Sequence, residues 1–436
     1  MAGCFVDMLI KYLHVPPSLI KILDREDKTS ALNSLIKQGL EFIQVHITQD
    51  NLSHWICSHS RAGDIIIDLT VNVDTISFLE ICQNQGIHYI NAALEQWQDP
   101  LIKGSLADQT LYTRHRDLQR AGFNPQGPTS ILDCGANPGL VSHFAKEALH
   151  ILAKEQGLES INLTYPDLAR KLGVQTIHIS EWDRQESSLR RIPLEFANTW
   201  SVEGLLEESL APAELGWGTH EEDFPPDGQF HSEGPGNQIF LEQPGCITMV
   251  QSWVPSGPIK GYVIRHGESF TLSRFFTLEE NGKVIYRPTV HYAYKLNETA
   301  EDSMAEWIES GYILPKKMTI LTHHLDRGRD ELGVLLMGDF GARWFGSLLD
   351  LTEANNLLPG HNATTLQVAA GLLSGLDTIL REPQRGVLFP EDLNHERALE
   401  VARPFLGPLV YKNCDWKPIL KPGQKGLWQF QNLRLS

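Results

Sequence analysis

The chain has no lysine or arginine over one long stretch. Between Ile192 and Ile259, a span of 68 residues, there are eleven acids, which carry −11 of the formal net charge of −17. Trp200, Trp217 and Trp253 stand among these acids. Carboxylates and the faces of indole rings both attract organic cations. The stretch therefore predicts a wall that binds a cation, with a solvated acidic loop as the alternative.

Basic residues are also in deficit over the whole chain, with 37 Lys and Arg against 54 Asp and Glu. A net negative field repels phosphate backbones and anionic membrane surfaces. We therefore expect neither nucleic acid nor a membrane as a partner, and we expect a small cationic substrate instead.

Cysteine is scarce and scattered. The six cysteines form no CxxC pair and no Cys/His cluster with the spacing of zinc ligands, so we expect no disulfide framework and no metal. A reducing cytoplasm is the expected compartment. No apolar run approaches the length of about 18 residues that spans a bilayer. The first helix-like segment is interrupted by Asp7 and Lys11, unlike a signal peptide.

The usual catalytic signatures are absent as well, since there is no GxSxG elbow, no HExxH and no P-loop. What the N-terminal third does show is short apolar runs that alternate with helix-like segments. The apolar runs are LIKILD, FIQVHIT, DIIIDLTV, IHYINAAL and TSILDCG. This alternation predicts a parallel, doubly wound α/β sheet. In such folds an acid at the end of the second strand holds the nucleotide ribose. Asp24, which ends LIKILD, is the candidate for this role, with a turn or cap residue as the alternative.

A dinucleotide-binding sheet of this kind should begin with a strand and a GxGxxG turn, and neither precedes the helix-like segment at residues 2–13. Only Gly3 could be a remnant of such a turn. The first strand of the sheet is central, so its absence would leave its neighbours with an unpaired edge. We expect that the natural start lies further upstream.

The pattern changes near Gly139. A helix-like segment follows it, and then a strand at 172–183 that contains Glu181, and then the acidic stretch. Strand-rich sequence continues to about residue 295, including residues 261–277, and predicts a largely antiparallel sheet in an α+β substrate domain. Residues 330–339 and 342–350 predict a hairpin. The longest clear helix, at 363–380, has an apolar face suited to packing back on the first domain. We therefore divide the chain into a nucleotide domain of residues 1–138 completed by about 352–436, and a substrate domain of 139–351.

Eight segments in this order give the sequence a resemblance to a known family. They are CGANPGLVSHFAKEAL, IHISEWDRQ, NTWSVEG, PAELGWGTHE, FLEQPG, YRPTVHYAY, DELGVLLMGD and NATTLQVAAGLL. In these segments the chain resembles the bacterial homospermidine synthases, relatives of the saccharopine dehydrogenases. The resemblance extends from about Leu19 to the C-terminus.

The resemblance implies a Rossmann-type domain, a substrate domain, a homodimer and bound NAD. It implies an aminobutyl transfer between two molecules of putrescine, which gives homospermidine and ammonia. In that family NAD accepts a hydride from putrescine, the imine loses ammonia, a second amine forms a Schiff base, and the hydride returns. The cofactor is recycled without net redox change.

The resemblance also assigns residues. It places Glu95 and Asn137 next to the nicotinamide, and it carries Glu181, Trp200, Glu208 and His266 over to the substrate pocket. On the cofactor side it carries over Asp24, Thr70, Val71 and Asn137.

Elementary energetics suit these residue types. An ammonium over a desolvated Trp face gains about 2 kcal/mol. A carboxylate about 4 Å away contributes roughly 4 kcal/mol at an effective dielectric near 20, before desolvation. Putrescine arrives protonated, so a base must remove a proton before hydride transfer, and Glu95, Glu208 or His266 could do so.

Two other interpretations stay open. A related dehydrogenase of the saccharopine or carboxynorspermidine type would need cations for a substrate carboxylate, and Arg265, Arg274 and Arg287 could supply them. A polyamine-binding member that has lost its phosphate turn would not be an enzyme.

Overall fold

The computed structural model describes residues 1–97, 105–188 and 192–435. Its N-terminal part alternates helices and short strands, as the apolar runs predict. The elements are α1 (Ala2–Leu13), β1 (Lys21–Asp24), α2 (Thr29–Ile36), β2 (Glu41–Gln44), α3 (Leu52–His59), β3 (Ile65–Asp68), α4 (Thr75–Gln85), β4 (His88–Asn91), α5 (Leu111–Ala121) and β5 (Ser130–Ile131).

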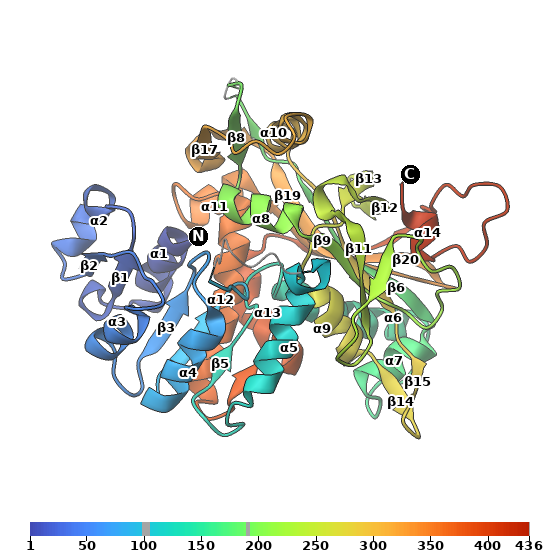
Figure 1. Cartoon of the computed structure of the whole chain (residues 1–436), viewed down its shortest axis with the longest axis horizontal. Helices are drawn as coiled ribbons and strands as arrows, with labels where there is room; N and C mark the ends of the chain where they lie inside the picture. Colours follow the sequence, from blue (N-terminus) through green and yellow to red (C-terminus); the bar gives the residue numbers. More distant parts are fainter. Residues whose placement is uncertain (98–104, 189–191, 436) are drawn as a thin grey trace.

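The strands of this part pair in parallel, which confirms the predicted sheet type. They form two separate ladders, β1 with β2, and β3, β4 and β5 with the later strand β21 (Val387–Leu388). Within the described residues β1 has no strand partner other than β2, and β3 has none other than β4. Figure 1 shows β1 and β2 with α1 to α3 at the left of the molecule and β3, α4 and β5 nearer its centre.

The next part is built around one large sheet. Its helices are α6 (Leu140–Glu155), α7 (Tyr165–Lys171), α8 (Val202–Leu210), α9 (Glu268–Phe275) and α10 (Glu298–Glu309). Its strands are β6 (Val174–Asp183), β7 (Glu186–Ser187), β8 (Glu195–Asn198), β9 (Pro212–Gly216), β10 (Gly228–Phe230), β11 (Gln238–Pro244), β12 (Met249–Val254), β13 (Gly257–Tyr262), β14 (Leu278–Glu280), β15 (Lys283–Tyr286), β16 (Thr289–Lys295), β17 (Lys317–Ile320), β18 (Leu325–Arg327), β19 (Arg329–Gly338) and β20 (Gly341–Asp350).

The large sheet has ten strands in the order β10, β11, β9, β16, β6, β19, β20 and β22 (Leu409–Cys414), with β12 and β13 attached. Only the pairing of β16 with β6 is parallel within its described strands. The sheet is thus largely antiparallel, as predicted, and the expected hairpin is present as β19 and β20.

The strand prediction is wrong for one segment. Residues 268–275 form helix α9, whereas the pattern of residues 261–277 predicted strand. Most side chains of α9 are buried, including Phe270, Thr271, Leu272 and Ser273. Burial on all sides removes the polar face by which a helix is recognised from sequence, so the apolar spacing also fits a strand.

The C-terminal segment joins both parts. It contains α11 (Leu351–Leu357), α12 (Ala363–Arg381), α13 (His395–Ala402), β22 (Leu409–Cys414) and α14 (Phe430–Leu433), with β21 before α13. Strand β21 pairs with β5 in the first sheet, whereas β22 pairs with β20 in the second. Figure 1 shows α12 and α13 in orange between the two parts. The division into residues 1–138 with 352–436 and residues 139–351 stays a prediction.

Helix α12 is the predicted long helix, and it begins at Asn362, whose side chain accepts a 2.8 Å hydrogen bond from the backbone N–H of Thr365. It is long and apolar enough to cross a membrane, but 78% of its apolar window is buried inside the fold. This burial is typical of a core helix.

Helix α12 also supports the loop after β5. A Cβ at Gly371 would lie 2.0 Å from the carbonyl oxygen of Gly135, so only glycine allows the helix to approach this loop.

Candidate active site

The residues assigned to the cofactor follow strands of the first part. Asp24 ends β1, and its Oδ1 accepts a 2.8 Å hydrogen bond from the backbone N–H of Glu26. Thr70 and Val71 follow β3, where the backbone and hydroxyl of Thr70 donate to Oδ1 of Asp68 at 3.0 and 2.7 Å. Asp24 and Thr70 thus follow the carboxyl ends of strands in two separate parallel ladders, and doubly wound folds bind nucleotides beyond the carboxyl ends of their strands.

Glu95 follows β4 and is held by the segment before α4. Its Oε2 accepts a 3.1 Å hydrogen bond from the backbone N–H of Asn72, and its own N–H donates to Oγ1 of Thr75 at 3.0 Å. Burial, followed by the negative charge of Glu207, raises the pKa of Glu95 to about 7. A carboxylate with this pKa is suited to accept a proton near neutral pH.

Asn137 and Glu181 meet at the boundary between the two parts. The Nδ2 of Asn137 donates to Oε2 of Glu181 at 3.1 Å, and Tyr292 of β16 donates to the same oxygen at 2.5 Å. Burial raises the pKa of Glu181, against these two hydrogen bonds. The Oδ1 of Asn137 is buried and accepts no hydrogen bond within the described part of the chain. An amide or ammonium of a bound molecule could therefore donate to it.

Two further buried carboxylates share the sheet face of Glu181. Asp183 lies two residues after it on β6, and Asp330 of β19 is opposite Asp183 in the register. Burial raises the pKa of both groups, that of Asp330 well above its usual range. None of these three acids has an ion pair with lysine or arginine among the residues that the structure describes. Buried acids without a cation favour a positively charged ligand.

Trp200 is fixed beside this face. Its Nε1 donates a 3.1 Å hydrogen bond to the hydroxyl of Tyr294, which is opposite Glu181 in the register. The rings of Tyr292 and Tyr294 are stacked, with centroids 5.1 Å apart. Two aromatic strand residues thus connect Trp200 to Glu181.

His266 lies between two acids, just before α9. Its Nε2 is 3.4 Å from Oε2 of Glu208 on α8, and its Nδ1 is 3.4 Å from Oε1 of Glu268. Burial alone would lower the pKa of His266, but Glu268 and Glu208 together raise it to about 10. The imidazole is therefore charged at neutral pH and lies between two carboxylates. Its ring centroid is 4.4 Å from that of Tyr292.

A pair of arginines holds the residue before Glu208. Arg114 of α5 is 2.7 Å from Oε1 of Glu207, and Arg265 binds the same oxygen. Burial alone would raise the pKa of Glu207, but Arg265 and Arg114 hold it at about 2. Glu207 thus stays charged and anchors α8 to α5, a helix of the first part.

The structure therefore brings together five of the predicted pocket residues. They are linked directly or through the two tyrosines, and they are Asn137, Glu181, Trp200, Glu208 and His266. The charges of Glu207 and Glu208 both act on Glu95. Among the described residues, no hydrogen bond or ion pair joins Asp24, Thr70 or Val71 to these five residues.

Nearly half of the acids in the acidic stretch are paired with lysine or arginine. Five of its eleven acids pair with cations from outside it, namely Glu195, Glu203, Glu207, Asp227 and Glu233. Glu208 faces His266. Trp217 is buried in the core, where its ring packs edge-on against Phe224. Of the predicted cation-binding wall, Trp200 and Glu208 are linked to the other predicted pocket residues.

Sequence reasoning missed Asp183, Glu268, Tyr292, Tyr294 and Asp330. A signal for some of them was present, since Glu181 and Asp183, and Tyr292 and Tyr294, are two residues apart and so share one face of a strand. The local sequence does not predict that Asp330 or Glu268 lies in the site, because their positions depend on burial and on residues distant in the chain.

The residues present fit the predicted NAD. The unpartnered oxygen of Asn137, the strand ends with Asp24 and Thr70, and the raised pKa of Glu95 are suited to a nucleotide with an amide-bearing reactive ring. No group of three or more His, Cys, Asp or Glu among the described residues is arranged for a metal.

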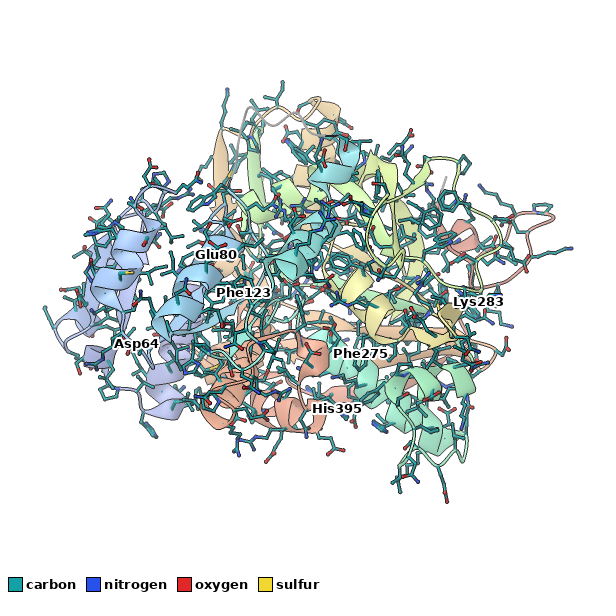
Figure 2. The ribbon with its side chains drawn as sticks, turned by 60° about the horizontal axis from the view of Figure 1, so that its bottom comes forward. Asp64, Glu80, Phe123, Phe275, Lys283 and His395 are labelled. Carbon is teal, nitrogen blue, oxygen red and sulfur yellow. The ribbon has the colours of Figure 1, made fainter. Side chains whose placement is uncertain are left out.

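A separate cavity of about 440 Å³ lies away from these residues. Lys146, Tyr165, Phe275 and His395 are in its lining, and none of the predicted site residues is. Figure 2 labels Phe275 and His395, which lie near each other on that side of the molecule.

Comparison with known proteins gives the same family for both parts of the chain. Residues 1–122 match the saccharopine dehydrogenase NADP binding domain, and residues 135–413 match the saccharopine dehydrogenase C-terminal domain. Homospermidine synthase of Mesorhizobium japonicum is 36% identical over 450 residues, which cover 98% of this chain and 92% of the relative. That of Blastochloris viridis is 36% identical over 440 residues, covering 95% and 91%.

A solved structure is similar over the whole chain. The crystal structure of homospermidine synthase from Legionella pneumophila in complex with NAD has a TM-score of 0.91 and 36% identity. The match covers 100% of this chain and 96% of that one.

Proposed function

The chain belongs to the homospermidine synthase family and matches two saccharopine dehydrogenase domains, and from this premise we propose how its pocket works. It is an enzyme that uses NAD to transfer an aminobutyl group between two molecules of putrescine, giving homospermidine and ammonia. NAD, when bound, supplies the capacity to accept a hydride from the amine-bearing carbon and to return it. All other steps depend on how residues of this chain hold the amines and move protons.

The observation that carries the proposed pocket is the face with Glu181, Asp183 and Asp330. These buried acids have no lysine or arginine partner in the described part of the chain, and two stacked tyrosines and Trp200 border them. We assign the far ammonium of putrescine to this face. Trp200 positions the chain through its ring, and Glu181 supplies attraction.

We assign the proton-accepting role to Glu95. The pKa of His266 is about 10, so at neutral pH this residue is already charged, whereas the pKa of Glu95 is about 7. A base that is half ionised near the working pH can both take a proton from the amine and release it. Glu208 and His266 would then hold the amine end between a carboxylate and a cation, next to Asn137.

The dehydrogenase alternative needs a free cation for a substrate carboxylate. Arg265 is bound to Glu207 and donates to the carbonyl oxygen of Gln109, and Arg287 donates to the carbonyl oxygens of Trp217 and Gly236. Arg274 lies over the ring of Phe389. Two of the three candidate arginines are thus committed to structural contacts.

Product analysis decides between these reactions. One sample contains putrescine and NAD, and the other contains lysine, 2-oxoglutarate and NADH. We expect homospermidine in the first and no NADH consumption in the second. The opposite pattern would favour the dehydrogenase, and no product in either sample would favour a polyamine-binding protein.

We also propose a homodimer in the cytoplasm, on the resemblance to the family. Light scattering should give twice the 49.0 kDa of one chain.

A further inference from the structure

The start of α9 lies against a buried carboxylate from the loop after β5. Gly267 precedes α9 and stands between His266 and Glu268, with φ −60° and ψ −38°, a conformation open to any residue. A Cβ here would lie 2.6 Å from Oδ2 of Asp133 and 3.3 Å from Nε2 of His115. The absence of a side chain at Gly267 therefore allows the Asp133 carboxylate to approach the backbone.

Asp133 is held in an uncommon backbone conformation. It has a φ of +53°, which non-glycine residues rarely adopt, and its side chain is buried. Its backbone N–H donates to Oδ1 of Asn91 at 3.0 Å, and the N–H of Cys134 donates to the carbonyl oxygen of Asn91 at 2.8 Å. Within the described residues, neither carboxylate oxygen accepts a hydrogen bond of regular geometry. The backbone is thus anchored, while the carboxylate is free to face α9.

His115 of α5 completes the contact. Its Nε2 is 3.1 Å from Oδ2 of Asp133, off the line of a straight hydrogen bond. Its ring lies edge-on to Phe270 of α9 at 4.5 Å between centroids and is stacked with Phe389 at 5.1 Å. Asp133 and His115 therefore both touch the segment that begins α9.

We propose that Asp133, backed by His115, is a positioning residue that sets where His266 and Glu268 stand relative to Asn137. Asp133 is four residues before Asn137 on one loop, and its carboxylate packs on the residue between His266 and Glu268. The contact thus couples the cofactor side of the site to the charged side of the pocket. A carboxylate at the N-terminus of α9 also has the favourable sign for the helix dipole. The inference rests on the proposed role of His266.

A double-mutant cycle tests the contact. Gly267→Ala keeps an allowed backbone and adds only the Cβ that meets Asp133, so it should lower kcat by about tenfold or more through misplacement of His266. KM for NAD should stay unchanged. The melting temperature should fall by no more than the few degrees that one overpacked methyl group costs, so the variant stays folded under assay conditions. Asp133→Gly suits the positive φ and removes the carboxylate, and it should lower kcat by a similar factor. In the Asp133→Gly background, Gly267→Ala should then cost less than twofold.

Four outcomes would contradict the positioning role. Independent, multiplying effects of the two changes would overturn the positioning role, as would an unchanged kcat for Gly267→Ala. A fall in melting temperature that parallels the loss of kcat would make the contact merely structural and overturn it too. A crystal structure of the Gly267→Ala variant should show the His266 imidazole displaced, and an unmoved ring would contradict the inference. Failure of the wild type to form homospermidine is a different result, because it would refute the proposed function and not the contact.

Discussion

The hydroxyl of Tyr292 donates a 2.5 Å hydrogen bond to Oε2 of Glu181, deep between the two parts of the chain. This bond favours the charged carboxylate, which burial disfavours. Asn137 donates to the same oxygen, so the charge of Glu181 depends on donors from both a strand of the substrate sheet and the loop after β5. The affinity of the pocket for an ammonium should follow the ionisation of this one group.

Tyr292→Phe should therefore weaken putrescine binding. Without the phenol the pKa of Glu181 rises further, so a smaller fraction is charged at pH 7, and KM should increase by about tenfold, since a hydrogen bond to a charged group contributes about 1.5–3 kcal/mol. Because a higher pKa means ionisation returns at higher pH, the defect should shrink between pH 7 and 9. Tyr294→Phe, which removes the partner of Trp200 instead, is the control and should show no such recovery. Equal KM for wild type and Tyr292→Phe at pH 7 would contradict the assignment.

Glu95→Gln should remove the proton acceptor. We expect kcat to fall by about 10²- to 10⁴-fold, the usual contribution of a general base. In the wild type, kcat/KM should rise with pH through about 7, because the pKa of Glu95 is about 7 and only the ionised form accepts a proton. This rise of kcat/KM with pH should be absent in the variant. Glu203→Gln, at an exposed pair with Arg25, is the control, and a retained rise in Glu95→Gln would assign the base elsewhere.

Trp200→Ala should raise the putrescine KM. The loss of a desolvated cation–ring contact of about 2 kcal/mol corresponds to roughly 30-fold. Trp217→Phe changes a buried residue of a hydrophobic cluster that includes none of the five pocket residues, and its KM should stay within about twofold. Steady-state kinetics with putrescine measures both, and the reverse order of effects would overturn the choice of Trp200.

Acid should destabilise the fold below the usual pKa of histidine. Burial lowers the pKa of His220 and His291 to about 4 and that of His178 well below its usual value. In the unfolded chain these groups bind protons near pH 6.5, so between pH 6.5 and 4 the unfolded state binds more protons and stability falls as pH falls. The slope should be at most about 1.4 kcal/mol per pH unit for each fully buried histidine. Urea unfolding at several pH values measures it, and His291→Gln should reduce the slope. A flat profile over this window would contradict the buried neutral state.

Local pattern was enough for the longer elements. The segments at Ala2–Leu13, Leu140–Glu155 and Ala363–Arg381 are helices, and β19 and β20 form the predicted hairpin. Each of these segments has its own hydrophobic periodicity, and the residues that start and end the element are within or next to it. Helix α9 lacks them because it is buried on most sides.

The site was less accessible to sequence because charge compensation is long-range. Eleven acids lie in one stretch of the sequence, but the cations that pair with them come from outside that stretch. Glu207 pairs with Arg114 and Arg265, and Asp227 pairs with Arg434. The resemblance supplied Glu181, Trp200 and His266. Only the folded chain shows that Asp330 joins Glu181 and Asp183 on one sheet face.

The recycled hydride is the central claim, and isotope transfer tests it most directly. The enzyme is incubated with unlabelled NAD and putrescine that carries deuterium on both terminal carbons. The account predicts homospermidine that retains the deuterium removed in the first step, with no accumulation of NADH. Homospermidine that has lost this deuterium to solvent, or deuterium that accumulates in NADH without homospermidine, would contradict it.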